Sequence, residues 1–117
     1  MGTPGHRRER LAGQIREEVA EMLVGELKDP RIGLTTITEV ELSGDLRHAR
    51  VLVSVLGNAE AQQATLEGLS SAAGFVRREL GRRLRLRRAP ELAFVLDHGA
   101  EVSEKIEAVL QKLKEQQ

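Results

Sequence analysis

The sequence contains no cysteine, tryptophan or tyrosine among its 117 residues. The lack of cysteine excludes disulfides, thiolate metal sites and cysteine nucleophiles. No uninterrupted apolar run approaches the roughly 20 residues that span a bilayer, and the N-terminal MGTPGHRRER lacks the apolar stretch of a secretory signal. The length is typical of one domain. We therefore expect a single-domain cytoplasmic protein that has no contact with membranes.

Residue patterns that carry catalysis are also scarce. The three histidines are widely separated, and two of them stand near an aspartate, in the pairs Asp45 with His48 and Asp97 with His98. Either pair could bind a metal or exchange a proton, but aspartates in such positions are typical of turns and strand ends. There is no glycine-rich phosphate loop with a lysine and no HExxH motif. The sequence therefore predicts neither an enzyme nor a site for a metal or cofactor.

Positive charge is concentrated in one segment although the total is balanced. Eighteen Lys and Arg residues offset eighteen Asp and Glu residues, which gives a formal net charge of 0. Within residues 77–88, however, Glu79 is the one acidic residue beside seven arginines, namely Arg77, Arg78, Arg82, Arg83, Arg85, Arg87 and Arg88. The planar guanidinium suits bidentate contacts with phosphate. We predict that this segment binds RNA; the alternative is a solvated helix face, although such faces usually pair acidic with basic residues.

Two groups of arginines have different expected placements. At helical spacing, Arg78, Arg82 and Arg85 lie roughly opposite Leu80 and would form an outward ridge. Such a ridge would bind phosphates without reading the base sequence. A second basic group stands near the N-terminus and is either another phosphate contact or the charged first turn of a helix; it consists of Arg7, Arg8 and Arg10.

The aromatic residues restrict the mode of recognition. Phe75 and Phe94 are the only two, and both lie in apolar runs that we expect in the core. Modules that read single-stranded RNA stack bases on exposed rings. With both rings buried, recognition would depend on phosphates and on the shape of a folded RNA.

Hydrophobic periodicity predicts alternating helices and strands. The expected helices cover 6–28, 59–86 and 101–114, and the expected strands cover 34–43, 47–56 and 90–97. In the first strand one side should carry Thr36, Thr38, Val40 and Leu42, and the other Ile37, Glu39 and Glu41. A short turn over 43–45 makes the first two strands a hairpin.

The order of the elements predicts an α+β domain with a three-stranded mixed sheet and helices on one face. The helical connection between the second and third strands suits parallel pairing. The second strand is therefore expected at the centre, antiparallel to the first. We expect a flexible N-terminus over 1–5, the domain over 6–98, and a C-terminal helix and tail over 99–117.

Glycines interrupt the long helical segment at positions 68, 74 and 81. Each costs about 1 kcal/mol relative to alanine in a helix interior. We expect a sharp bend within 71–74 that divides the segment into two helices. A bulky β-branched residue at Gly74 should then harm folding or binding more than Gly68→Ala.

Six short motifs follow one another along nearly the whole chain. They are Asp29-Pro30-Arg31, Thr36-Ile37-Thr38-Glu39-Val40, Ser43-Gly44-Asp45-Leu46, Val53-Ser54-Val55-Leu56-Gly57, the segment Leu69 to Arg77, and the segment Leu84 to Phe94. In this order they resemble the bacterial ribosome-binding factor A family, over residues 7 to 110.

The resemblance implies a type II KH-like fold with the order α-β-β-α-(kink)-α-β. In this family a kink, here at Ala72, Ala73 and Gly74, replaces the usual Gly-x-x-Gly loop. The resemblance also implies binding to the small (30S) ribosomal subunit and its 16S rRNA, help in maturation of the 5′ end of that rRNA, and a role in cold adaptation. We expect a monomer without a cofactor. The alternative is a protein-interaction module whose arginine ridge binds an acidic protein partner.

Overall fold

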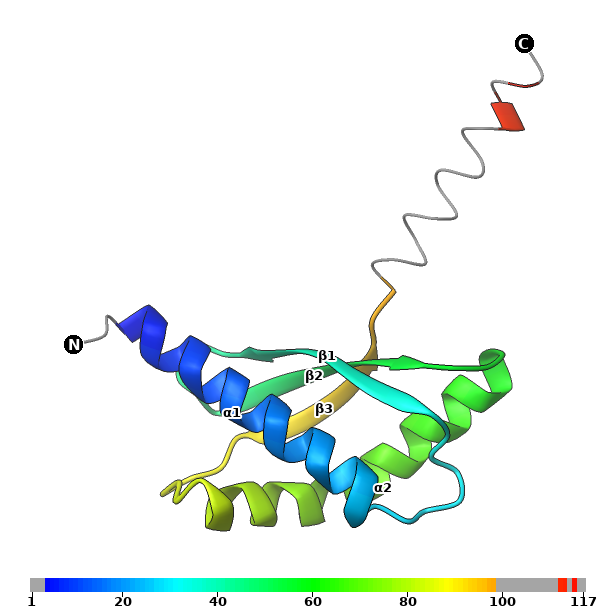
Figure 1. Cartoon of the computed structure of the whole chain (residues 1–117). Helices are drawn as coiled ribbons and strands as arrows, with labels where there is room; N and C mark the ends of the chain where they lie inside the picture. Colours follow the sequence, from blue (N-terminus) through cyan, green and yellow to red (C-terminus); the bar gives the residue numbers. More distant parts are fainter. Residues whose placement is uncertain (1–3, 99–111, 114, 116–117) are drawn as a thin grey trace.

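The computed structural model describes residues 4–98, 112, 113 and 115. Its elements are helix α1 (Pro4–Gly25), strands β1 (Thr35–Leu42) and β2 (His48–Val55), helix α2 (Ala59–Arg83) and strand β3 (Glu91–Leu96). The sheet has the order β1-β2-β3, with β2 antiparallel to β1 and parallel to β3 (Figure 1). This arrangement confirms the predicted mixed sheet. The expected C-terminal helix over 101–114 lies outside the described residues apart from positions 112 and 113.

Both helices cover the same face of the sheet (Figure 1). The apolar stripe of α1 is fully buried at Ile15, Val19 and Met22, and α2 buries Leu69, Val76 and Leu80. The central strand β2 meets them with alternate residues, namely Ala49, Val51, Val53 and Val55. Burial of these side chains from both helices against one sheet face accounts for the α+β arrangement.

Strand β1 departs from strict alternation. Its register against β2 shifts between Ile37 and Glu39, so that Ile37 and Val40 are both buried although they are three residues apart. The predicted two-sided pattern is therefore wrong in this strand. An extra residue in one strand of a pair is a β-bulge, which re-aims the side chains that follow it. At the bulge, the Thr38 hydroxyl donates a hydrogen bond to the Asp97 carboxylate at 2.8 Å.

Helix α2 is continuous through the position of the expected kink. Asn58 caps its N-terminus by accepting a hydrogen bond from the Ala61 amide. The division into two helices at 71–74 is wrong, since the residues of the expected kink, Ala72, Ala73 and Gly74, all remain helical. Figure 1 shows that the axis of this single helix changes direction along its length.

The close approach occurs at Gly68 rather than at Gly74. Gly68 is buried, and a Cβ placed on it would lie 2.8 Å from Cγ1 of Ile32, in the connection after α1. A Cβ on the exposed Gly74 would meet only the Arg78 side chain, at 3.7 Å. The same connection is tied to α2 by Arg31, which donates hydrogen bonds to Ser71 and Asp29. Arg31 thereby lowers the pKa of Asp29 to about 2.

Phe75 is not a core residue. Phe94 is buried as expected, but Phe75 is 37% exposed on the outer side of α2. The helical seam places Val76 and Leu80 against the sheet, which turns position 75 toward solvent.

Candidate nucleic-acid interface

Three segments that are distant in the sequence meet at one end of the molecule. They are the first turns of α1, the β1–β2 turn and the α2–β3 connection, which lie together at the left of Figure 1. The Arg8 guanidinium reaches the turn, within 3.9 Å of the place that a Cβ on Gly44 would take. We call this region the basic end; its exposed arginines are Arg7, Arg8, Arg10, Arg47, Arg85, Arg87 and Arg88. The N-terminal arginines and the last arginines of the basic segment therefore form one group in space.

The basic end contains a pocket of about 390 Å³, which we call the arginine–leucine pocket. Its walls come from all three segments: Arg7, Arg10, Leu11 and Gln14 from α1, Leu46 from the turn, and Leu86, Arg87 and Arg88 from the connection. The three leucines are half-buried, whereas the four arginines are exposed. None of these four guanidinium groups forms an ion pair with any residue that the structure describes. Unpaired cations around a hollow favour a polyanionic ligand.

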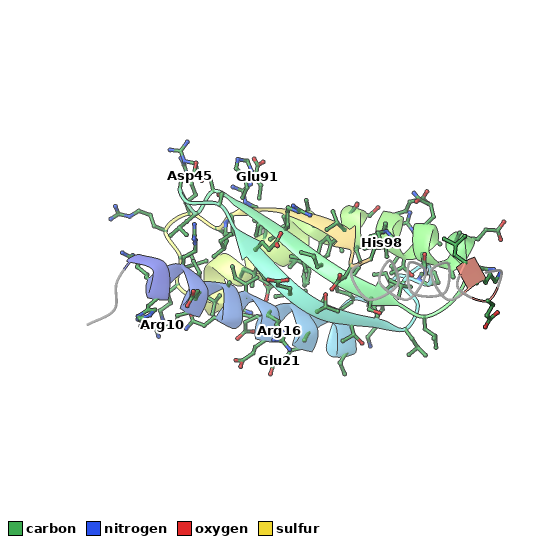
Figure 2. The ribbon with its side chains drawn as sticks, turned by 90° about the horizontal axis from the view of Figure 1, so that it is seen from above. Arg10, Arg16, Glu21, Asp45, Glu91 and His98 are labelled. Carbon is green, nitrogen blue, oxygen red and sulfur yellow. The ribbon has the colours of Figure 1, made fainter. Side chains whose placement is uncertain are left out.

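A neighbouring hollow of about 300 Å³ shares Arg88 with this pocket. It is also lined by Arg47, His48, Arg77 and Glu91. The Arg77 Nε donates a hydrogen bond to the Ala89 carbonyl at 3.1 Å, which ties α2 to the connection. Figure 2 shows Arg10, Asp45 and Glu91 toward the same end of the molecule. The sequence interpretation missed Arg47, although its place directly after a predicted turn marks it as exposed at a loop tip.

The turn aspartate at this end has a structural role. Asp45 accepts hydrogen bonds from the Ser43 hydroxyl at 2.7 Å and from the Arg47 amide at 3.0 Å. These bonds hold the pKa of Asp45 below its usual range. The carboxylate is thus committed to the turn, as the pattern of Asp45 and His48 predicts.

The end of α2 explains how Arg85 is placed. The Leu86 amide donates a hydrogen bond to the Gly81 carbonyl at 2.9 Å, and Arg85 has a φ of 54°. This is the Schellman arrangement, in which the left-handed residue is usually glycine. Because α2 ends at Arg83, Arg85 lies beyond the helix. Of the three arginines of the predicted ridge, only Arg78 and Arg82 are on the helix. All three are exposed, as expected.

Replacing Arg85 by glycine is expected to stabilise the fold. A left-handed conformation costs a non-glycine residue roughly 1–2 kcal/mol, of which the greater flexibility of glycine in the unfolded chain offsets part. We expect the free energy of unfolding to rise by about 0.5–1 kcal/mol in urea titrations. A fall would show that the aliphatic part of Arg85 contributes more than its backbone costs.

The outer face of α2 carries the remaining exposed arginines. Arg82 is 70% exposed but pairs with Glu79, at 2.7 Å between Nη2 and Oε1. The hydrogen bond from Arg82 is the main reason that the pKa of Glu79 lies below its usual range. Arg78 has no ion-pair partner among the described residues and lies beside the exposed Phe75.

Arg83 differs from the other arginines in being internal. Its side chain is only 19% exposed and forms ion pairs with Glu18 of α1, with Glu26 directly after α1, and with Glu79 of its own helix. These carboxylates raise the pKa of Arg83, and the largest cause is the hydrogen bond that Arg83 donates to Glu26. Arg83 therefore stabilises the contact between α1 and α2. Its guanidinium is not free to bind RNA, in contrast to the prediction from the sequence.

Acidic residues gather away from the basic end. Glu17 and Glu21 lie in the second half of α1, Glu26 directly follows this helix, and Glu60 and Glu67 lie in the first half of α2. Figure 2 shows Arg10 and Glu21 at different points along α1. Within the described residues, acidic side chains are therefore concentrated away from the arginines of the basic end.

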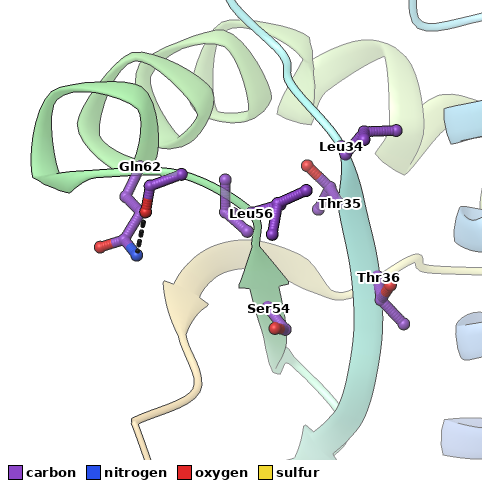
Figure 3. A pocket seen from close by; sticks show the side chains of 8 residues that line it. Leu34, Thr35, Thr36, Ser54, Leu56 and Gln62 are labelled. Atoms are coloured by element: carbon purple, nitrogen blue, oxygen red, sulfur yellow. Dashed lines mark hydrogen bonds between the residues drawn. The ribbon is translucent and has the colours of Figure 1, made fainter. Parts of the chain in front are cut away.

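The opposite end of the hairpin has a pocket without ionisable residues. It has a volume of about 520 Å³ and is lined by Leu34, Thr35, Thr36, Ser54, Val55, Leu56, Gly57 and Gln62 (Figure 3). The Gln62 side chain donates a hydrogen bond to the Gly57 carbonyl at 3.3 Å. Leu34 and Leu56 are each 75% exposed. This pocket adds no charge to the basic interface.

Two other kinds of site are absent from the described part of the chain. No group of three or more His, Asp or Glu residues there could hold a metal ion. No helix in that part is long and apolar enough to cross a membrane.

Comparison with known proteins gives a consistent result. Residues 7–110 match the family model of ribosome-binding factor A. The ribosome-binding factor A of Synechococcus sp. (strain CC9605) is 47% identical over 114 residues, which cover 96% of this chain and 81% of that protein. The protein of Synechocystis sp. (strain PCC 6803) is 50% identical over 106 residues, which cover 89% of this chain and 80% of that protein.

Solved structures agree with the sequence relatives. A solution structure from Thermotoga maritima, described as a putative ribosome-binding factor A, is 40% identical with a TM-score of 0.73 and covers 85% of this chain and 94% of that one. A homology model of the Thermus thermophilus factor, fitted into the cryo-EM map of its complex with the 30S subunit, is 33% identical with a TM-score of 0.60. It covers 74% of this chain and 90% of that one. By sequence and by fold, the chain belongs to the ribosome-binding factor A family.

Proposed function

We propose that this protein is a non-catalytic assembly factor that binds the small (30S) ribosomal subunit. The basic end contacts phosphates of folded 16S rRNA, and the bound factor assists maturation of the 5′ end of that rRNA and supports growth in the cold. It acts as a monomer, without a cofactor. The observation that carries the proposal is the convergence of seven exposed arginines from three segments on one end of the molecule.

The chemistry of the basic end favours RNA phosphates as the ligand. Phosphate contacts supply most of the sequence-independent affinity of nucleic-acid binding, and they fix the orientation of the protein on its target. The Thermus relative described above was fitted into a map of a 30S complex, which supports the same partner here.

The exposed arginines also outnumber the exposed rings. Phe75 is the one aromatic side chain with substantial exposure in the described part, and it lies on α2 beside Arg78. A single ring cannot form the stacking platform on which single-strand binders hold successive bases. Recognition through phosphates and shape fits the compact surface of a ribosomal subunit better than an unstructured strand.

The test is the sedimentation of the protein in sucrose gradients of a cell lysate. We expect the full chain to travel with free 30S subunits rather than with complete ribosomes. In cells that lack the protein, primer extension should detect more 16S rRNA with an immature 5′ end, most clearly in the cold. Sedimentation only with RNA-free protein complexes would contradict the proposal and favour an acidic protein partner.

A further inference from the structure

The arginine–leucine pocket combines two chemistries that a site for phosphate alone does not need. Its rim carries four exposed arginines, while its floor consists of the half-buried Leu11, Leu46 and Leu86. The volume of about 390 Å³ lies within the range of roughly 300–1,000 Å³ that is typical of small-molecule sites. A ligand that matches the whole pocket has a flat apolar part as well as negative charge.

The backbone around the pocket is held in an unfavourable conformation. Within the described residues, Leu46 (φ 61°) and Arg85 (φ 54°) are the non-glycine positions with positive φ. Leu46 lines the pocket, and Arg85 directly precedes Leu86, which also lines it. The Leu46 amide closes the turn by donating to the Ser43 carbonyl at 3.0 Å, and a hairpin turn of this kind usually has glycine at the left-handed position. Such strain is typical of ligand sites.

We propose that this pocket binds one unstacked nucleotide of a folded RNA. The leucines pack against the face of the base, and the arginines bind its phosphate and those of its neighbours. A nucleotide is the unit of RNA that carries both a flat apolar ring and a negative charge. Unpaired bases in bulges and loops can be splayed out in this way, and guanidinium planes can stack on them. The inference rests on the proposed function and specifies what its basic end recognises.

The test compares two RNA hairpins with equal numbers of phosphates, one fully paired and one with a single-nucleotide bulge. Binding of the full-length protein is measured by fluorescence anisotropy over a range of salt concentrations. We expect a preference for the bulged hairpin of about tenfold, the low end of the range for one base stacked on an aromatic ring, because leucines pack less closely on a base than a ring does. Leu46→Asn should abolish this preference but keep the salt dependence, because asparagine tolerates positive φ and leaves the arginines in place.

A matched control is Leu34→Asn, which changes an exposed leucine at the opposite end of the hairpin and should keep the preference. Circular dichroism checks the fold of each variant. If Leu46→Asn unfolds, Leu86→Gln tests the same floor from the α2–β3 connection and should likewise remove the preference. If a correctly folded Leu46→Asn or Leu86→Gln variant still prefers the bulged hairpin, the inference is overturned.

Other outcomes separate this inference from the proposed function. Equal affinity for the two hairpins, with arginine-dependent binding to both, would overturn the nucleotide pocket and leave phosphate binding intact. Absence of binding to either hairpin and to 30S subunits would overturn both proposals. A third outcome is that the protein binds free AMP, that Leu46→Asn abolishes this binding, and that the two hairpins bind equally. This outcome would assign the pocket to a free nucleotide and overturn its assignment to RNA. Displacement of the RNA by an acidic peptide, with no preference for the bulge, would also overturn it.

Discussion

Replacing Arg7, Arg10, Arg87 and Arg88 together by glutamine is expected to remove most of the affinity for the 30S subunit. These side chains surround one pocket and have no ion-pair partner among the described residues, so their charge is available to a ligand. If each arginine contributes about 0.7–1 kcal/mol, within the net range of an ordinary hydrogen bond, binding should weaken by about 100- to 1,000-fold. The slope of log K against log salt should decrease by about 0.7–0.9 for each phosphate contact that is lost.

The control for this variant removes positive charge elsewhere. Arg16, Lys28 and Arg50 are exposed and lie outside the basic end, so their replacement by glutamine should change affinity only slightly. Each of these surface substitutions should change the free energy of unfolding by no more than about 0.5 kcal/mol. An unchanged salt slope in the four-arginine variant would place the contact elsewhere, on the outer face of α2 at Arg78 and Arg82.

Gly68→Ala and Gly74→Ala should change stability in opposite directions although they lie on the same helix. A Cβ on Gly68 would lie 2.8 Å from Cγ1 of Ile32 and 3.4 Å from Cβ of Arg31. Overpacking of this kind typically costs about 1–3 kcal/mol. A Cβ on Gly74 has ordinary space, so the alanine should stabilise the helix by up to about 1 kcal/mol.

Urea unfolding of the two variants measures this difference directly. Equal effects at both positions would mean that the connection after α1 does not pack closely on α2. The sequence instead predicted that a bulky β-branched residue at Gly74 would do more harm than Gly68→Ala, because a sharp bend was expected at residues 71–74. The apolar pattern of one helix gives no information about how closely another segment packs on it. Ile32 lies against Gly68 only in the folded chain.

The strands and helices could be predicted because each has a regular apolar pattern of its own. In β2, the alternate residues Val51, Val53 and Val55 predict both the strand and its buried face. The pattern was less reliable where one extra residue shifts the register, as in β1 after Ile37. Phe75 shows a related error, because membership of an apolar run does not establish that a side chain faces the sheet.

The candidate site could be predicted in composition but not in arrangement. The arginines near position 8 and near position 87 are recognisable from the sequence, and their role as one group follows from the meeting of α1 with the α2–β3 connection. Arg83 shows the opposite case, a residue of the basic segment that the fold removes from the candidate site. Its side chain pairs with Glu18 and Glu26 instead. A carboxylate about 60 residues away in the sequence cannot be paired with it by spacing alone.

The separation of the basic end from the acidic parts of α1 and α2 gives a neutral molecule a permanent electric dipole. Because its net charge is zero, the protein experiences little overall attraction to the many other polyanions of a cell. Its dipole nevertheless experiences a torque in the electric field of RNA. The molecule therefore turns as it approaches, so that the arginines arrive first and fewer encounters are unproductive. The charge distribution thus governs how fast and in which orientation the protein arrives, in addition to how tightly it is held.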